Sequence, residues 1–239
     1  YELKTKNCEM QMTHSYYKYV VALISVLVFF LMAGIVWAQT GKPIVVIDPA
    51  HGGKDQGVLG IHQAAEKDLT LAIALAMQRE LAQDSRIQVV LTRNDDRTVS
   101  VEDRREKIQK LHPAMVLSLH VNAGFGRNSS GFEMYYPGFK SLEASRAGEN
   151  GQTVTSQNQY LGDAVKLARL TQKNLDVLFP RKGRGLREAM TPLSEGLSVP
   201  VLVVELGFVT NAEEKKKLTD GKIQADIARA LAKSVQAFF

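Results

Sequence analysis

Short apolar runs alternate with longer amphipathic stretches along this chain, a pattern typical of strands that alternate with helices. Five runs rich in aliphatic residues predict strands at 44–48, 87–92, 115–120, 131–136 and 200–209. Helical spacing or capping residues predict helices at 66–81, 100–111, 161–178 and 223–239, and a short helix after Asn211 with Glu214 three residues on. This order indicates a single α/β domain with a mainly parallel twisted sheet and helices on both faces.

Two polar stretches interrupt this pattern. Residues 140–159 are rich in Gly, Ser and Asn, which predicts a surface loop. Residues 180–187 carry two glycines among four basic residues, Arg181, Lys182, Arg184 and Arg187, which indicates a loop or the entry to a strand.

The N-terminal segment has the pattern of a targeting sequence. Tyr19 to Ala38 contains no charge and follows Lys18, which is typical of an export signal or a membrane anchor. Only five residues separate Ala38 from the first predicted strand, a tether of at most about 18 Å that would hold a retained domain against the bilayer. We therefore expect cleavage after Ala38, so that 1–38 is a signal peptide and 39–239 the catalytic domain; a retained signal anchor is the alternative. Either arrangement places the domain outside the cytoplasmic membrane.

Composition narrows the class of protein. Hydrophobic residues make up 45% and charged residues 23%, as in ordinary globular domains. The net charge of +5 comes from basic residues interleaved with acids, and no basic stripe with aromatic residues is present, so we expect no nucleic-acid partner. The single cysteine, Cys8, precedes the apolar segment, which excludes disulfides and thiolate metal ligands from residues 39–239. We expect a monomer.

Candidate chemistry lies where predicted elements begin or end. His51 follows the first strand at a Pro/Gly corner, Glu66 begins the first helix, and His120 ends the third strand. Ligands in α/β proteins bind at the carboxyl ends of the strands, so these side chains could converge on one zinc ion with an open position for water. Taken alone, His51 is more often an ordinary loop histidine, and Glu66 is simply an acid favoured by the helix dipole.

Two further carboxylates need an explanation. Glu205 lies within an apolar run, where an unpaired carboxylate is costly to bury. It is either a general base poised by burial or one half of a structural ion pair. Asp48 either orients a ligating imidazole or is a turn residue at the end of its strand.

Four motifs in order resemble a known family. They are Asp48-Pro49-Ala50-His51-Gly52-Gly53, Glu66-Lys67, Ser118-Leu119-His120-Val121-Asn122-Ala123 and Glu205-Leu206-Gly207-Phe208-Val209-Thr210-Asn211. From about Ile44 to the C-terminus the chain resembles the zinc-dependent N-acetylmuramoyl-L-alanine amidases of the amidase-3 type, which are peptidoglycan hydrolases. Ala50 departs from the glycine usual in that family, which a backbone of negative φ tolerates.

The resemblance implies a reaction and a set of roles. His51, Glu66 and His120 would hold Zn²⁺, and Glu205 would be the catalytic carboxylate. The zinc-activated water would cleave the amide bond between N-acetylmuramic acid and the L-alanine of the stem peptide, with Glu205 as general base. The partner would be peptidoglycan, in the periplasm or on the cell-wall side of the cytoplasmic membrane, with membrane contact only if the N-terminal segment is retained.

Two other functions stay open on the sequence. One is a different zinc peptidase that cuts within the stem peptide, and the other is a catalytically silent wall-binding protein. The basic run raises a separate hypothesis, that Arg184 or Arg187 pairs with carboxylates of the stem peptide. The alternative, which the sequence favours, is a solvated basic surface loop.

Overall fold

The computed structural model describes residues 24–25, 41–124, 128–138, 152–180 and 182–239, without the side chains of 152–158. The chain divides into two units, residues 1–42 and 43–239. The expected targeting segment therefore lies outside the described residues, apart from Ile24 and Ser25, which are helical. Across the described part of the chain, no helix is both long enough and apolar enough to cross a membrane. The description below concerns the second unit.

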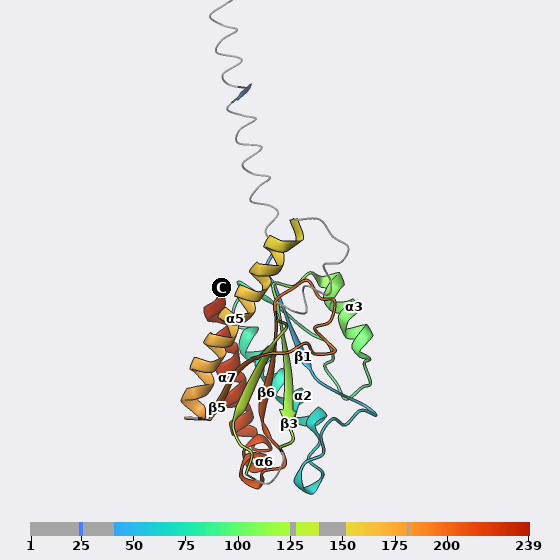
Figure 1. The fold of residues 1–239 in the computed structure, drawn as a ribbon, viewed down its shortest axis with the longest axis vertical. Helices are drawn as coiled ribbons and strands as arrows, with labels where there is room; N and C mark the ends of the chain where they lie inside the picture. The colour runs from blue at the N-terminus through green and yellow to red at the C-terminus, as the bar shows by residue number, and fades with distance from the viewer. Residues whose placement is uncertain (1–23, 26–40, 125–127, 139–151, 181) are drawn as a thin grey trace, which may run out of the picture. The chain divides into compact units, whose positions relative to one another are not determined.

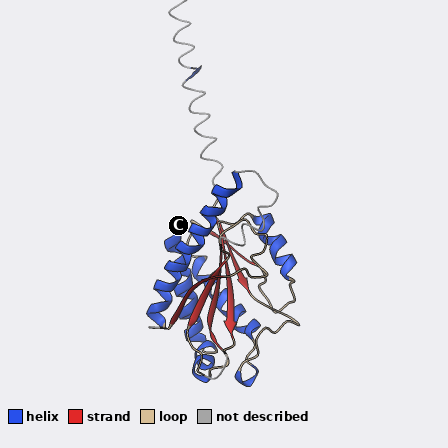
Figure 2. Ribbon diagram, viewed as in Figure 1, coloured by secondary structure: helices blue, strands red, loops and turns tan. Residues whose placement is uncertain are grey.

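This unit is built on one sheet, drawn in red in Figure 2. The sheet has six strands in the order β2-β1-β3-β6-β4-β5. The strands are β1 (Ile44–Pro49), β2 (Gln88–Leu91), β3 (Met115–Asn122), β4 (Phe132–Tyr136), β5 (Gly183–Glu188) and β6 (Val201–Phe208). All neighbouring strands run parallel except β4 and β6, which are antiparallel. The predicted mainly parallel sheet is confirmed.

Helices cover both faces of this sheet, as the alternation of elements predicts. They are the short 3₁₀ helix η1 (Ile61–Gln63) and the α-helices α2 (Glu66–Leu81), α3 (Val101–Leu111), α5 (Gln152–Leu178), α6 (Ala212–Leu218) and α7 (Gly221–Phe238). Helices α2, α5 and α7 pack together over one face, and α3 lies over β1 on the other (Figure 1). Because β1, β3 and β6 are buried on both faces, they are nearly continuous apolar runs in the sequence.

Strand pleating decides which polar residues share a face. Successive side chains of a strand point to opposite faces. Leu119 and Val204 belong to the large core under α2 and α7. Their neighbours His120 and Glu205 therefore point to the face that carries α3, and these two residues are paired in the β3–β6 ladder. The carboxyl ends of β3 and β6 thus bring an imidazole and a carboxylate together.

Capping residues set two of the helix starts. Ser100 Oγ accepts a hydrogen bond from the backbone N–H of Asp103 at 3.0 Å, which confirms the predicted start of α3. Asn211 caps α6 by accepting from the N–H groups of its first turn. Glu214, expected to complete that cap, instead accepts from the N–H groups of Gly131 and Phe208. Its carboxylate thereby ties the start of β4 to the end of β6.

The structure corrects the end of the first polar stretch and decides between the two alternatives for the second. Of the loop predicted at 140–159, residues 140–151 lie outside the described residues, and from Gln152 onward the chain is already in α5. Residues 180–187 were predicted as a loop or the entry to a strand, and from Gly183 onward they belong to the edge strand β5, which ends at Glu188 and pairs with β4; Arg181 lies outside the described residues. An edge strand with one apolar residue, Leu186, has no alternation from which to recognise it.

Candidate metal centre

The loop after β1 places His51 by an unusual backbone conformation. His51 has φ of 62°, in the left-handed region that non-glycine residues rarely adopt. Ala50 is not among the residues of positive φ, so its methyl group is tolerated as expected. Further along the loop, Gly57 has φ of 63°, and a Cβ there would lie 2.5 Å from Glu66 Oε2. Glycine is required at that position because the Glu66 carboxylate approaches the main chain so closely.

Glu66 is the most enclosed member of the site. It is the first residue of α2 and is only 2% exposed. Its carboxylate accepts hydrogen bonds from the backbone N–H groups of Val58 at 2.9 Å and Val121 at 3.0 Å. Burial alone would raise the pKa of Glu66, but the hydrogen bonds from His120 and His51 outweigh it and hold that pKa well below its usual range. Glu66 is therefore ionised, and it faces two imidazoles.

Those imidazoles close a three-residue cluster. Glu66 Oε1 lies 3.0 Å from His120 Nδ1, and Glu66 Oε2 lies 3.1 Å from His51 Nε2. The three candidate ligand atoms all lie within 4.8 Å of one another, so His51, Glu66 and His120 form a group that could hold a metal ion. The sequence expectation that these three side chains converge is met by this geometry.

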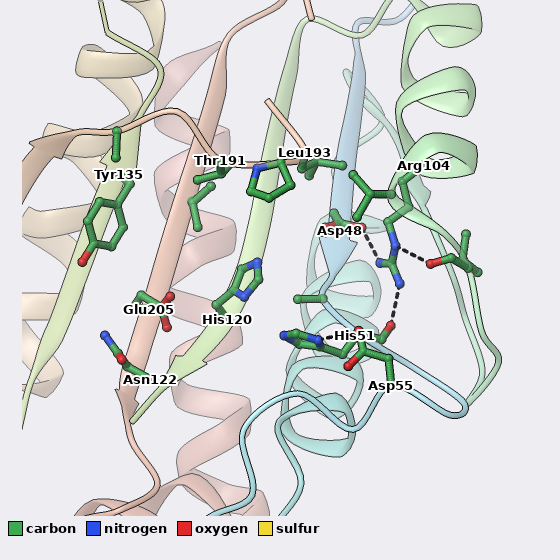
Figure 3. Close-up of a pocket in the computed structure, with 16 residues that line it drawn as sticks. Asp48, His51, Asp55, Arg104, His120, Asn122, Tyr135, Thr191, Leu193 and Glu205 are labelled. Carbon is green, nitrogen blue, oxygen red and sulfur yellow. Dashed lines mark hydrogen bonds and ion pairs between the residues drawn. The ribbon is translucent and has the colours of Figure 1, made fainter. Parts of the chain in front are cut away.

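Asp55, which the sequence reasoning missed, fixes the orientation of the His51 ring. Its Oδ2 lies 2.8 Å from His51 Nδ1, and Figure 3 shows the two side chains side by side. A proton on Nδ1 directed at Asp55 leaves Nε2 facing Glu66, which is the arrangement of a ligating histidine held by a carboxylate. The only signal in the sequence was an acid four residues after His51 in the same loop.

The electrostatics of the cluster favour the binding of a cation. The hydrogen bond to Glu66 raises the pKa of His51 to about 9; burial opposes this shift, and the charge of Glu66 and Asp55 adds to it. Burial would lower the pKa of His120, but the hydrogen bond to Glu66 and the charge of Glu205 raise it. The carboxylates thus draw positive charge onto the imidazoles, and a divalent cation would supply that charge instead. Two imidazole nitrogens and one carboxylate oxygen are a ligand set compatible with a metal ion.

Glu205 lies beside the cluster with one oxygen unused. Its Oε2 is buried and has no hydrogen-bond partner among the described residues. Burial raises the pKa of Glu205 to about 7, and the neighbouring charges of Glu66 and Glu133 add to the effect of burial. Within the described part of the chain no cation lies at ion-pair distance from Glu205, so the alternative of a structural ion pair finds no partner there. A buried carboxylate with a free oxygen is costly for stability and available for proton transfer.

A cavity of about 470 Å³ opens beside these groups (Figure 3). Its polar lining includes His51, Asp55, His120 and Glu205, together with Asp48, Arg104, Asn122, Tyr135 and Thr191. Apolar lining comes from the start of α3, the segment before β6 and β6 itself: Val99, Val101, Pro192, Leu193 and Val203. This cavity can hold a substrate group against the cluster and Glu205 at the same time.

Asp48 has neither of the roles that the sequence suggested. It is buried, and it pairs with Arg104 of α3 at 2.7 Å. It also accepts hydrogen bonds from Thr92 at 2.5 Å and from Ser118 at 2.8 Å. Asp48 therefore joins three elements beneath the site instead of orienting an imidazole or ending a strand in a turn.

The basic residues of β5 are held by a buried carboxylate. Arg184 donates a hydrogen bond to Glu133 of β4, and an Arg187 nitrogen lies 3.7 Å from the same carboxylate. Tyr135 donates to the other oxygen of Glu133 at 2.5 Å. Glu133 is paired with Glu205 in the β4–β6 ladder, so this cluster borders the catalytic candidate. The arginines thus belong to an ordered strand edge and not to the solvated loop that the sequence favoured.

Comparison with known proteins gives one family. Residues 45–237 match the model of the amidase-3 family, described as N-acetylmuramoyl-L-alanine amidase. N-acetylmuramoyl-L-alanine amidase AmiC of Escherichia coli O6:H1 is 24% identical over 226 residues, a match that covers 84% of this chain and 54% of AmiC. AmiA of E. coli K12 is 29% identical over 223 residues, covering 83% of this chain and 77% of AmiA. The chain therefore spans about half of AmiC and about three quarters of AmiA.

Solved structures agree with the family match. The catalytic domain of CwlV, an N-acetylmuramoyl-L-alanine amidase from Bacillus (Paenibacillus) polymyxa var. colistinus, superposes with a TM-score of 0.68 and 27% identity. That match covers 82% of this chain and 97% of the CwlV domain. An N-acetylmuramoyl-L-alanine amidase from Clostridium difficile 630 gives the same TM-score at 28% identity, covering 83% of this chain and 97% of that structure.

Proposed function

The chain belongs to the amidase-3 family of N-acetylmuramoyl-L-alanine amidases, and from this premise we propose that it is a peptidoglycan hydrolase that cleaves the amide bond between N-acetylmuramic acid and the L-alanine of the stem peptide. The observation that carries the proposal is the position of Glu205. Its unpartnered, buried oxygen lies beside a cluster of two imidazoles and a carboxylate that could hold a metal ion. Metal-assisted amide hydrolysis requires both a metal ion and a group that transfers a proton.

We assign the metal as zinc, held by His51, Glu66 and His120. Two histidines and a glutamate, with a further position open, are a ligand set of catalytic zinc sites. When bound, zinc polarises a carbonyl and lowers the pKa of water towards about 7. Asp55 keeps the His51 ring turned so that Nε2 faces the cluster, and the N–H groups of Val58 and Val121 hold the Glu66 carboxylate.

Glu205 moves the proton in this proposal. As a carboxylate it accepts a proton from the attacking water, whose oxygen forms a bond to the lactyl carbonyl carbon. The C–N bond then breaks, and Glu205 gives the same proton to the departing L-alanine nitrogen, so that atoms and charge balance. Burial raises the pKa of Glu205, which makes this carboxylate a stronger base than an exposed one.

The β5 edge is where we place the stem peptide. Arg184 and Arg187 are about 40% and 55% exposed, and both contact Glu133, which neighbours Glu205. Both guanidinium groups therefore remain partly accessible at this edge. A guanidinium group pairs well with the carboxylates of a stem peptide.

We further propose that residues 1–38 direct export and that 39–239 act on the wall outside the cytoplasmic membrane. The uncharged run from Tyr19 to Ala38 after Lys18 supports this location. N-terminal sequencing of the mature protein should begin at Gln39 if the segment is cleaved. Recovery of the uncleaved chain in the membrane fraction would instead support the anchor.

Digestion of purified sacculi tests the proposed reaction. The full chain should release stem peptides that begin with a free L-alanine amino group, and a chelator should abolish the release until zinc is restored. Product masses decide between functions: cuts within the stem peptide would indicate a different zinc peptidase. No release by zinc-loaded protein would indicate a silent wall-binding protein and overturn the proposal.

A further inference from the structure

Two buried arginines lie under the loop that carries His51. Arg93 follows β2 and is completely buried, and Arg104, on α3, is 4% exposed. A buried guanidinium group needs acceptors for its N–H groups. Most of the acceptors here are main-chain carbonyl oxygens, and four of these belong to residues 49–51 and to the first turn of α2. No hydrogen bond or ion pair joins either arginine to the side chain of a proposed ligand in the described structure.

Arg104 contacts the backbone of His51 itself. It donates to the carbonyl oxygens of Pro49 at 2.8 Å and of His51 at 2.5 Å. Asp48 balances its charge at 2.7 Å (Figure 3). His51 is the residue whose φ is 62°. A residue in this rarely populated conformation keeps it only where the surrounding structure enforces it. Arg104 contributes by binding the carbonyl oxygen of His51.

Arg93 joins the segments that carry two of the proposed ligands. One of its nitrogens donates to the carbonyl oxygens of Ala50 and Lys67, both at 2.8 Å. Ala50 directly precedes His51, and Lys67 directly follows Glu66. A Cβ at Gly52, where φ is 131°, would lie 2.9 Å from Arg93 Cδ and 2.4 Å from the carbonyl oxygen of Arg97. Glycine at this position lets Arg93 reach beneath the loop.

We propose that Arg93 and Arg104 are positioning residues that set the metal affinity of the centre through the main chain. Arg104 fixes the backbone of His51, and Arg93 fixes the separation of the segments that carry His51 and Glu66. This inference rests on the proposed function, because it takes His51, Glu66 and His120 as the metal ligands. A lysine keeps the charge but has one nitrogen, so it cannot reach the same set of acceptors as the planar guanidinium fork.

The test is the zinc dissociation constant of Arg104→Lys in the full chain, measured by competition with a chromophoric chelator. We expect binding about 10- to 100-fold weaker than in the wild type, the usual effect of losing a group that orients a ligand. Arg105→Lys is the matched control: it is the next residue on the same helix, and its partners Glu102 and Glu195 are exposed. Its zinc affinity should equal that of the wild type.

A second control separates positioning from loss of stability. Ile108 is fully buried on α3, so Ile108→Val weakens the packing of that helix without touching the His51 loop. Its zinc affinity should stay at the wild-type value even where its melting temperature falls. If Ile108→Val loses as much affinity as Arg104→Lys, the arginine acts only through stability and the inference is overturned.

Two measurements report the geometry itself. Cobalt(II) in place of zinc absorbs visible light according to its coordination, and we expect the spectrum of Arg104→Lys to change. In the metal-free protein, amide hydrogen exchange across residues 50–57 should become faster in Arg104→Lys and not in Arg105→Lys. If Arg104→Lys does not fold, Arg93→Lys takes its place with the same expectations.

The outcomes distinguish this inference from the proposed function. Wild-type zinc affinity and an unchanged cobalt spectrum in the arginine variants would overturn the positioning role and leave the zinc amidase proposal intact. A wild-type chain that binds no zinc would overturn both.

Discussion

The two halves of the site differ in how completely their polar groups are paired. In the braced half, formed by Asp48, His51, Glu66, Arg93, Arg104 and His120, the carboxylates and guanidinium groups are all bonded or paired. In the open half, formed by Glu133, Tyr135, Arg184, Arg187 and Glu205, a buried carboxylate oxygen has no partner and two arginines remain substantially exposed. The braced half contains the candidate ligands of a metal, and the open half contains the candidate groups for substrate and proton.

The difference follows from what each half is proposed to do. A metal centre requires ligands that keep their positions, so cross-linking by buried hydrogen bonds is an advantage. A general base must exchange a proton and contact a changing substrate, so full satisfaction of its oxygens would be a handicap. The halves come from neighbouring strands of one sheet, with His120 and Glu205 paired across β3 and β6.

The largest expected effect tests whether the braced half holds a metal at all. His120→Ala removes one of three proposed ligands, and we expect loss of stoichiometric zinc and fall of activity to background with the fold retained. Metal analysis and circular dichroism check this. His62→Asn is the control, because His62 is exposed and Asn tolerates its φ of 56°. Full zinc occupancy in His120→Ala would refute the ligand assignment.

The next effect separates the two halves. Glu205→Gln keeps the shape of the side chain and cannot accept a proton, so turnover should fall by about 10²-fold or more while zinc content is unchanged. Steady-state kinetics and metal analysis on the same sample measure both quantities. Glu213→Gln, an exposed acid at the start of α6, should behave as wild type. Near-normal turnover in Glu205→Gln would show that Glu205 has a structural role and is not the general base.

The next prediction concerns how much the buried Asp48–Arg104 pair contributes to the stability of the braced half. Asp48→Asn leaves Arg104 buried without its counter-charge, which should lower the free energy of unfolding by about 3 kcal/mol at neutral pH. Urea unfolding measures this loss. Asp95→Asn, which removes an exposed partner of Arg97, should change stability by less than about 1 kcal/mol. An equal loss in both variants would show that the buried pair is no more important than a surface one.

The same pair predicts a dependence on pH. Burial alone would raise the pKa of Asp48, but Arg104 and the hydrogen bonds from Thr92 and Ser118 bring it below its ordinary 3.8. The unfolded chain, with a pKa of about 3.9, therefore takes up the proton first as pH falls. The stabilisation is complete above the unfolded pKa and is lost as pH falls through the folded pKa. Unfolding free energies of wild type and Asp48→Asn should therefore converge in acid, and a constant difference would contradict this account.

The smallest expected effect concerns the substrate edge of the open half. Arg187→Ala removes a charge whose ion pair with Glu133 spans 3.7 Å, so the fold should be unaffected. An exposed pair with a stem-peptide carboxylate is worth up to about 1 kcal/mol, which corresponds to a KM raised about two- to fivefold with kcat unchanged. Kinetics on a soluble muropeptide at low salt measure this, with Arg229→Ala on α7 as the control. Identical KM values would remove Arg187 from substrate binding.

The sequence predicted the braced half better than the open one. The strand and helix ends that carry His51, Glu66 and His120 follow from apolar periodicity, and α2 begins and ends at the predicted residues. The partner of Asp48 did not follow, because Arg104 lies 56 residues away and meets it only when α3 packs on the sheet. Periodicity shows which face of an element is buried, and it does not show which polar groups meet there.

The open half was harder to predict because one of its strands, β5, carries a weak pattern, whereas β4 and β6 lie close to their predicted ranges. The edge strand β5 has exposed positions at both ends and only Leu186 as an apolar residue. Without that strand, Glu133 cannot be recognised as the carboxylate that holds Arg184 and Arg187.

The role of Asp55 could not be predicted either. Asp55 is exposed and contacts His51 only because the loop after β1 reverses direction through its glycines.

The arginine contacts beneath the loop after β1 have a consequence for how this protein can be altered. They are made to carbonyl oxygens, which every residue type carries, and the outward side chains of Lys54 and Gln56 are exposed and take no part in them. Substitutions at these two positions should change the exposed surface of the loop while the geometry of the centre is unchanged. Lys54 and Gln56 are thus the positions to diversify in a library, whereas Gly52, Asp55 and Gly57 of the same loop must be kept because they contact or admit the groups of the centre.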